Sequence, residues 1–338
     1  MSDTSDKNYK PVIGISVGDY NGIGPEVIIK TFSDTRMFDF VTPVVYGDGR
    51  IFSFYRKELK IQGFNYNQTK SIEKLRYGQL NIYNFDSSTI NIQPGIASKD
   101  AGEFAINSLQ KAVNDLKEGR IQALVTAPLN KDLVQAENFK FPGHTEYLTQ
   151  QADAKESLMF LVAENLRIGV VTGHIPLSQV SERLTKERLT SKIEIMLQSL
   201  KKDFGIKKPR IAVLGLNPHA GENGLLGLEE KEIIDPVIEY FKNRGDLVLG
   251  SFPSDGFFGN GQFKNFDGIL GMYHDQGLIP FKNMAFEEGV NYTAGLSFIR
   301  TSPDHGTAFN IAGKGIANEA SFRSAVFLAI DIIKHRLG

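Results

Sequence analysis

The sequence predicts an α/β protein with a largely parallel sheet. Short runs of β-branched residues alternate with helical stretches along the whole chain, which is the pattern of strand–helix–strand units. The 338 residues also exceed the roughly 250 to 300 at which one hydrophobic core usually stops growing. We therefore expect two lobes, and they should share strands or crossovers because no Gly-, Pro- or Ser-rich linker divides the chain.

The first elements are a strand at residues 12–17 and a helix that opens at Gly24. Pro25 stands in the first turn of that helix, where proline is favoured. Over residues 99–118 the apolar residues recur at intervals of three and four, and Gly119 follows as a stop signal. This spacing predicts a second helix with one buried face.

The later part of the chain continues the alternation. Strands are expected at residues 121–128, 166–173, 209–218, 246–250 and 266–273, and helices at residues 186–204, 229–243 and 318–336. We expect the first lobe to consist of residues 1–130 and 300–338, and the second lobe to consist of residues 131–299.

Composition excludes several classes of partner and site. The formal net charge is −1, with basic and acidic residues intermixed, so we expect no nucleic-acid or membrane-surface binding. The chain contains no cysteine, which excludes disulfides, thiolate metal sites and a cysteine nucleophile. The polar N-terminus and the lack of a long apolar run indicate a cytoplasmic protein.

Three of the six histidines occupy equivalent places in the pattern. His174, His219 and His274 each follow an apolar run that reads as a parallel strand. In open parallel sheets, ligands bind beyond the carboxyl ends of the strands, and three imidazoles with an open position suit a divalent transition metal. The alternative is that each histidine is an ordinary loop residue or helix cap. Spacing does not distinguish convergence within one chain from ligands shared across a dimer.

Two carboxylates accompany the histidines. Asp275 adjoins His274, and Asp255 lies in the Gly-rich stretch FPSDGFFGNG, which we expect to be a turn. Near a metal, either carboxylate could orient a ligand or take a proton from a substrate hydroxyl. The simpler interpretation is that Asp255 only caps a local turn.

A second set of residues suggests the binding of an anion. His144 and Thr145 follow a glycine just before an expected helix, where free backbone N–H groups favour an anion. Lys282, Asn291 and Arg300 are cationic or amide donors that we expect in loops near strand ends. Together they could form a phosphate pocket; the alternative is solvated surface charge and helix capping.

Two glycine-rich loops resemble nucleotide-binding loops without matching their patterns. GDYNGIGPE at residues 18–26 follows a strand and precedes a helix, yet it fits neither G-x-G-x-x-G nor G-x-x-x-x-G-K-[ST]. NPHAGENGLLG at residues 217–227 could cradle a pyrophosphate or simply turn the chain. Neither loop establishes a Rossmann-type fingerprint.

Several motifs coincide with one family. GDYNGIGPE, TAPLNK, FPGHTEYL, TGHIPL, GLNPHAGENG, MYHDQGLIPFK, GVNYTAGLSFIRTSPDHGTA and AGKG occur in this order from residue 18 to residue 315. The chain resembles the 4-hydroxythreonine-4-phosphate dehydrogenase family of pyridoxal phosphate biosynthesis. It departs from the family at GDYN, where many members carry Asp-Pro-Ala, and at SDGFF, where the family usually has Asp-Thr-Leu-Phe and Asp255 is kept.

The resemblance implies a fold and a set of roles. It implies an isocitrate/isopropylmalate dehydrogenase-like fold of two α/β/α lobes, with the active site in a cleft completed by the second subunit of a homodimer. His174, His219 and His274 would bind a divalent metal such as zinc, magnesium, cobalt or manganese, with one ligand from the partner. His144, Thr145, Lys282, Asn291 and Arg300 would contact the substrate, mainly its phosphate. NAD or NADP would lie along residues 217–227 and the loop after Arg300, near Asn217, Glu222 and Asp304.

The implied reaction is the oxidation of 4-phosphooxy-L-threonine to a 2-amino-3-oxo acid, which loses carbon dioxide to give 3-amino-2-oxopropyl phosphate. The metal would lower the pKa of the substrate hydroxyl, Asp275 or Asp255 would take its proton, and the hydride would pass to the nicotinamide. One alternative is a paralogous dehydrogenase of a phosphorylated sugar acid, phospho-threonate or phospho-erythronate. Another is a metabolite-binding relative without catalytic activity.

Overall fold

The structure, a computed structural model, describes residues 10–86, 90–130, 141 and 143–338. Two compact units make up the chain: the first is Met1–Asp153 with Ser297–Gly338, and the second is Ala154–Leu296. Lys131 of the TAPLNK motif, Pro142 of FPGHTEYL and the predicted lobe boundary after residue 130 fall at or outside the limits of the described residues.

Unit 1 is built on a parallel sheet. Its strands are β1 (Val12–Ser16), β2 (Thr42–Gly47), β3 (Tyr66–Thr69), β4 (Leu80–Asn84), β5 (Ala123–Thr126) and β12 (Ile299–Pro303). They run in the order β3-β4-β2-β1-β5-β12, and every described pair is parallel. The central strands β1, β2 and β5 are buried along almost their entire length, as expected for a parallel sheet covered on both faces.

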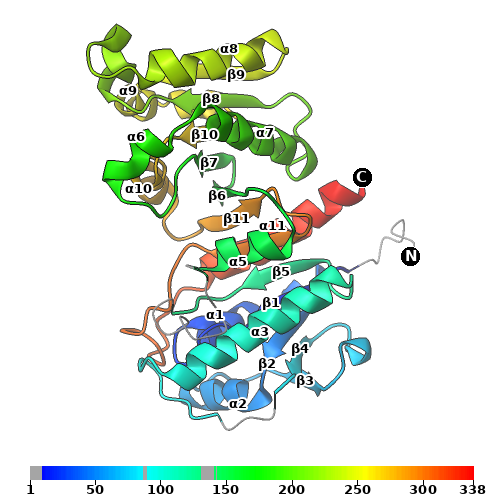
Figure 1. The fold of residues 1–338 in the computed structure, drawn as a ribbon. Coiled ribbons are helices and arrows are strands. Elements are labelled where there is room, and N and C mark those ends of the chain that lie inside the picture. Colours follow the sequence, from blue (N-terminus) through cyan, green and yellow to red (C-terminus); the bar gives the residue numbers. More distant parts are fainter. Residues whose placement is uncertain (1–9, 87–89, 131–140, 142) are drawn as a thin grey trace. The chain divides into compact units, whose positions relative to one another are not determined.

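The helices of unit 1 cover this sheet. They are α1 (Gly24–Ser33), α2 (Gly49–Glu58), α3 (Lys99–Lys117), α5 (His144–Gln151) and α11 (Ala320–Leu337), with the short 3₁₀ helices η1 (Thr35–Asp39) and η2 (Ile72–Lys74). Helix α3 begins where Ser98 accepts a hydrogen bond from the Ala101 amide, and it packs along β1, β2 and β5 (Figure 1). Helix α11 packs against β5 and β12.

Unit 2 is built on a mixed sheet. Its strands are β6 (Leu158–Ala163), β7 (Leu166–Val170), β8 (Arg210–Leu214), β9 (Leu247–Phe252), β10 (Gly268–Gly271) and β11 (Val290–Ala294). They run in the order β11-β6-β7-β10-β8-β9. Strand β6 pairs antiparallel with β11 and β7, whereas β7, β10, β8 and β9 are mutually parallel. The four parallel strands therefore present their carboxyl ends at one edge.

The helices of unit 2 are α6 (Val180–Arg183), α7 (Lys186–Lys202), α8 (Asp235–Asn243), α9 (Ser254–Gly259) and α10 (His274–Ala285). Between them lie the 3₁₀ helices η3 (Leu177–Gln179), η4 (Pro218–Gly224) and η6 (Gln262–Asn265), and the π-helical turn η5 (Glu230–Ile234). Phe257 of α9 and Phe281 of α10 are buried among side chains of β6, β7, β8 and β10. Burial of each phenyl ring contributes roughly 1.5 to 3 kcal/mol, which fixes both helices to the sheet.

The α/β class predicted from the sequence is confirmed, and so is each strand and helix predicted above, with shorter limits for most strands. Helix α5 belongs to unit 1, whereas the prediction put residues 144–151 in the second lobe; no change of composition marks this boundary. The cleft between two lobes stays a prediction. In the described part of the chain, no helix combines the length and apolar composition needed to cross a membrane.

Candidate functional site

The three predicted metal ligands follow three adjacent strands of unit 2. Strand β10 pairs in parallel with β7 on one side and with β8 on the other. His174 follows β7, His274 begins α10 directly after β10, and His219 lies in η4 after β8. The topology thus places all three histidines in the segments that follow the carboxyl ends of these strands, where parallel sheets bind ligands.

Two of these histidines lie close together. The ring centroids of His174 and His274 are 5.5 Å apart, with an angle of 46° between the ring planes. Both rings line a pocket of about 310 Å³, whose other lining residues are Gly173, Ile175, Leu177, Val180, Tyr273 and Asp275. The Asp275 carboxylate lies within hydrogen-bonding distance of His274, with 2.7 Å between Oδ1 and Nδ1.

This donor set fits a divalent transition metal. Imidazole nitrogens are preferred ligands of zinc, cobalt and related ions, and a metal-bound histidine commonly has a carboxylate on its second ring nitrogen. The contact between His274 and Asp275 has that form, because it leaves Nε2 of His274 available. Within the described residues, however, no group of three or more His, Asp or Glu side chains is arranged to hold a metal ion. The three-histidine site stays a prediction.

His219 is exposed and stands in an unusual backbone segment. From His219 to Asn223 every residue has a positive φ, at 54°, 52°, 76°, 43° and 58°. For residues other than glycine the left-handed conformation costs roughly 1 to 2 kcal/mol each. A run of four such residues and one glycine persists only where surrounding contacts hold it. We infer that contacts from the rest of unit 2 hold the NPHAGENGLLG loop in this conformation; its binding of a pyrophosphate stays a prediction.

Asp255 lies in a helix and not in the predicted turn. It is an exposed residue in the first turn of α9, next to Ser254. The turn prediction was wrong because three glycines in FPSDGFFGNG weaken the helical pattern, whereas burial of Phe257 against the core stabilises the helix. The structure does not bring Asp255 into contact with His274 or Asp275 in any described interaction.

One residue at this edge was missed by the sequence analysis. Gln276 accepts a hydrogen bond from the Met272 amide (2.6 Å) and donates to the Gly215 carbonyl (2.6 Å) and the Ser254 hydroxyl (2.7 Å). These partners follow β10, β8 and β9 respectively, so one side-chain amide ties three loops together. Its position inside the MYHDQG motif was the only signal available.

The predicted anion-binding residues divide between the units. In unit 1, His144 and Thr145 form the start of α5, as predicted, and both are half-buried. Arg300 is 3% exposed in β12, and its guanidinium donates to Oγ1 of Thr126 over 2.7 and 3.1 Å. Burial lowers the pKa of Arg300 to about 10, against the opposing charge of Glu146, so the group remains cationic at neutral pH.

In unit 2, Lys282 is half-buried in α10 and Asn291 lies in β11. The prediction that Lys282, Asn291 and Arg300 lie in loops was wrong: one is helical and two are in strands whose polar residues mask the strand pattern. The Oδ1 atom of Asn291 is buried and has no hydrogen-bond partner in the part of the chain that the structure describes. An amide rotated by half a turn would offer its NH₂ group there, which suits a phosphate oxygen. The shared phosphate pocket stays a prediction.

The candidate cofactor residues also lie in both units. In unit 2, Asn217 uses its NH₂ group internally, donating to Glu229 (2.8 Å) and Glu230 (2.9 Å), while Glu222 is exposed in η4. In unit 1, Asp304 follows β12, and its amide donates to Ser321 Oγ over 3.1 Å. Any contact from Asn217 to a cofactor would therefore use Oδ1. The cofactor role of all three residues stays a prediction.

The first glycine-rich loop, where the sequence departs from the family, is buried in unit 1. Asn21 donates to the Ile96 carbonyl (2.9 Å) and accepts from the Gln93 amide (2.7 Å), and Tyr20 packs edge-on against Phe104. Asp19 is fully buried: its Oδ1 accepts a hydrogen bond from the Asn21 amide, and its Oδ2 has no hydrogen-bond partner among the described residues. Desolvation raises the pKa of Asp19 to about 6, against the effect of that hydrogen bond.

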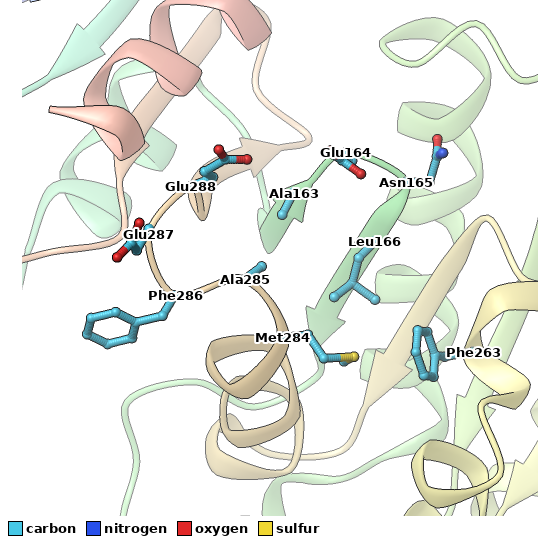
Figure 2. A pocket seen from close by; sticks show the side chains of 10 residues that line it. All are labelled: Ala163, Glu164, Asn165, Leu166, Phe263, Met284, Ala285, Phe286, Glu287 and Glu288. Carbon is cyan, nitrogen blue, oxygen red and sulfur yellow. The ribbon is translucent and has the colours of Figure 1, made fainter. Parts of the chain in front are cut away.

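Unit 2 has a second pocket, of about 520 Å³, at the opposite end of β7 from His174 (Figure 2). Met284 and Phe263 face one another across it, whereas Phe286 points away. No predicted site residue lines it. We therefore assign the candidate site to the carboxyl edge and not to this pocket.

Comparison with known proteins identifies relatives over almost the whole chain. The family model described as "Pyridoxal phosphate biosynthetic protein PdxA" matches residues 39–329. A protein of Bacteroides thetaiotaomicron named 4-hydroxythreonine-4-phosphate dehydrogenase is 46% identical over 325 residues, which cover 96% of this chain and 89% of that protein. A protein of Oceanobacillus iheyensis, provisionally named a D-threonate 4-phosphate dehydrogenase, is 40% identical over 96% of this chain and 98% of its own length.

A solved structure agrees with these matches. The crystal structure of 4-hydroxythreonine-4-phosphate dehydrogenase from Klebsiella pneumoniae has a TM-score of 0.85 and 34% sequence identity. The match covers 97% of this chain and 99% of that chain. The similarity thus extends over both units and over every motif noted in the sequence.

Proposed function

The chain belongs to the family of the pyridoxal phosphate biosynthetic protein PdxA, and from this premise we propose that it is an NAD-linked, metal-dependent 4-hydroxythreonine-4-phosphate dehydrogenase. The observation that carries the proposal is the pair of histidines at 5.5 Å, with Asp275 on Nδ1 of His274, at the carboxyl edge of the unit 2 sheet. A protein that only bound a metabolite would not need this arrangement.

The residues divide the work of the reaction. A divalent metal held by His174, His219 and His274 would supply a Lewis acid for the substrate hydroxyl. The hydroxyl proton would pass to a carboxylate, Asp255 or Asp275, and a bound nicotinamide would accept the hydride, because no side chain can do so. The resulting 2-amino-3-oxo acid loses carbon dioxide. The contact with His274 supports an orienting role for Asp275, which leaves Asp255 as the stronger candidate for the proton acceptor.

We propose that binding of the substrate phosphate holds the substrate in place for this reaction. Arg300, Lys282 and Asn291, with His144 and Thr145 at the start of α5, would bind the phosphate away from the reacting carbon. Binding energy from a remote group is then used to align the hydroxyl. Arg300 suits this role because it is buried, cationic and already fixed by Thr126.

The proposal includes a cytoplasmic homodimer with a shared active site. Leu177, which lines the histidine pocket, is 72% exposed, and Ile279, one helical turn beyond Asp275 in α10, is 65% exposed. Exposed apolar side chains next to a site favour a covering partner. A second copy of the chain would cover them and could supply the third histidine ligand.

An assay of NADH formation tests this function. The purified chain is incubated with NAD⁺, Co²⁺ or Zn²⁺, and 4-hydroxythreonine 4-phosphate; we expect NADH and carbon dioxide in equal amounts, and no turnover after removal of the metal with a chelator. No NADH under these conditions would refute the function.

The second candidate substrate is D-threonate 4-phosphate, which the Oceanobacillus relative suggests. It has the same phosphate and an oxidisable hydroxyl but lacks the amino group. Parallel measurement of kcat/KM on both substrates identifies the better one. A higher kcat/KM for D-threonate 4-phosphate would indicate that oxidation of this compound, and not of 4-hydroxythreonine 4-phosphate, is the activity of the protein.

A further inference from the structure

We propose that Glu230 is the residue that positions His219, and that it does so by holding the left-handed turn of η4 in shape. The inference rests on the proposed function, in which His219 is a metal ligand. Nothing in the sequence patterns pointed to Glu230, which stands outside the glycine-rich motif. Its role follows from the contacts it makes.

The Glu230 carboxylate binds the segment that leads into the turn. Oε1 accepts hydrogen bonds from the backbone amides of Leu216 and Asn217, each at 2.7 Å, and Oε2 accepts from Nδ2 of Asn217 at 2.9 Å. The side chain is 3% exposed. These bonds fix the backbone immediately before Pro218, where the change to left-handed conformation begins.

The turn itself closes around the same carboxylate. A Cβ atom added at Gly221 would lie 2.6 Å from Oε2 of Glu230, closer than real contacts allow. Gly221 also has a φ of 76° and accepts a hydrogen bond from the Leu226 amide. Only glycine permits this approach in this conformation, so the turn and the carboxylate are fitted to one another.

The contacts of the Glu230 carboxylate are hydrogen bonds to the loop and not ion pairs. No Lys, Arg or His side chain of the described residues forms a salt bridge with it, and its oxygens are satisfied by the loop. A buried carboxylate is costly without such hydrogen bonds. Glu230 also begins the π-helical turn η5, and π-turns inside helices are frequent at functional sites.

A second contact connects this segment to the other histidine. The Gly215 carbonyl, one residue before Leu216, accepts a hydrogen bond from Gln276 in α10, the helix that begins with His274. Glu230 therefore holds a segment whose other side is tied to the helix of a second ligand. Loss of the Glu230 contacts should displace His219 without displacing His274.

The test compares Glu230→Gln with wild type and with Asp203→Asn. The glutamine has the same shape, but its NH₂ group faces donors of the loop. Asp203 is a matched control because it is also 3% exposed and in unit 2, yet it accepts from Ser199 and Tyr292. Co²⁺ affinity is measured by calorimetric titration and the ligand set by the visible spectrum of the Co²⁺ protein.

We expect Co²⁺ binding to weaken by roughly 10- to 100-fold in Glu230→Gln, as is typical when residues that orient metal ligands are replaced, with an altered spectrum. Asp203→Asn should keep the wild-type affinity and spectrum. If circular dichroism shows that Glu230→Gln does not fold, Gly221→Ala disturbs the same contact from the other side and should give the same loss. Wild-type affinity and spectrum in the folded variant would overturn the inference. Absence of Co²⁺ binding by wild type would instead refute the metal-dependent function.

Discussion

The Oδ1 atom of Asp275 lies 2.7 Å from Nδ1 of His274, at the start of α10. A carboxylate in this position would fix both the orientation and the tautomer of the imidazole and would leave Nε2 for the predicted metal. Asp275 is exposed on its other side, within the pocket that His174 also lines. We therefore predict different roles for the two candidate carboxylates, Asp275 and Asp255.

If Asp275 orients His274, Asp275→Asn should weaken metal binding by roughly 10- to 100-fold, and excess metal should restore much of kcat. Asp255→Asn, in contrast, should keep the metal affinity and lose activity that excess metal does not restore. Metal titrations monitored by NADH formation distinguish the two. An Asp275→Asn enzyme with wild-type metal affinity would contradict the orienting role.

Lys282 is predicted to bind the phosphate of the substrate. Removal of a charge-assisted hydrogen bond costs about 1.5 to 3 kcal/mol, so Lys282→Ala should raise KM by roughly 10- to 100-fold. Because the phosphate lies away from the reacting carbon, the metal affinity should not change. Lys242→Ala, which alters an exposed lysine of the same unit, is the control. Equal KM values in Lys282→Ala and the control would exclude Lys282 from the phosphate site.

Asp19 should make the stability of the protein depend on pH. Its pKa is raised from 3.8 to about 6 by desolvation, so the folded state retains a proton that the unfolded state releases. The contribution of Asp19 to the free energy of unfolding therefore falls as pH rises from about 4 to about 6, by an amount on the order of 3 kcal/mol.

Asp19→Asn removes this titration, so its stability relative to wild type should rise across the same pH range and level off above it. Thermal denaturation at a series of pH values measures the difference. The exposed Asp100 serves as a control through Asp100→Asn. A difference between Asp19→Asn and wild type that does not vary with pH would show that Asp19 does not hold its proton in the folded state.

The exposed apolar residues near the histidine pocket should lie in the dimer interface. Leu177→Glu and Ile279→Glu each place a charge in a surface that a second copy would bury. Sedimentation should therefore show monomers, and the enzymatic activity should fall because the dimer is lost. Tyr77 in unit 1 is 74% exposed and provides the control Tyr77→Glu. Dimers of unchanged stability in both variants would show that Leu177 and Ile279 lie outside the dimer interface.

Most of the predicted strands are apolar in their centres, and the strands with polar centres were not predicted; strand β6 (LMFLVA) is apolar and was also not predicted. Strands β7 (LRIGV), β8 (RIAVL) and β10 (GILG) are apolar apart from Arg167 and Arg210, and one of the three histidines follows each strand. Strands β11 (VNYTA) and β12 (IRTSP) contain Asn291 and Arg300, and these polar residues break the hydrophobic pattern. Two of the residues predicted to bind substrate therefore lie in strands that have no continuous apolar run.

Helix α10 shows a second reason why parts of the fold could not be predicted from the sequence. Its sequence HDQGLIPFKNMA contains Gly277 and Pro280, both poor helix formers. The structure explains the glycine, because a Cβ atom there would lie 2.8 Å from Val170 of β7. Close packing of α10 on the sheet therefore outweighs the low helix propensity of Gly277 and Pro280. No local sequence pattern indicates this packing. The positions of Gln276 and Glu230 could not be predicted for the same reason, since their partners are distant in sequence.

The most direct test of the metal site is anomalous diffraction from crystals of the assembled protein grown with Co²⁺ or Zn²⁺. We predict one strong peak per chain, with nitrogen atoms of His174, His219 and His274 as ligands at about 2.0 to 2.1 Å, whether the three rings come from one chain or from two. A metal bound by other residues, or three histidine rings too far apart to share an ion in any combination of subunits, would contradict the account.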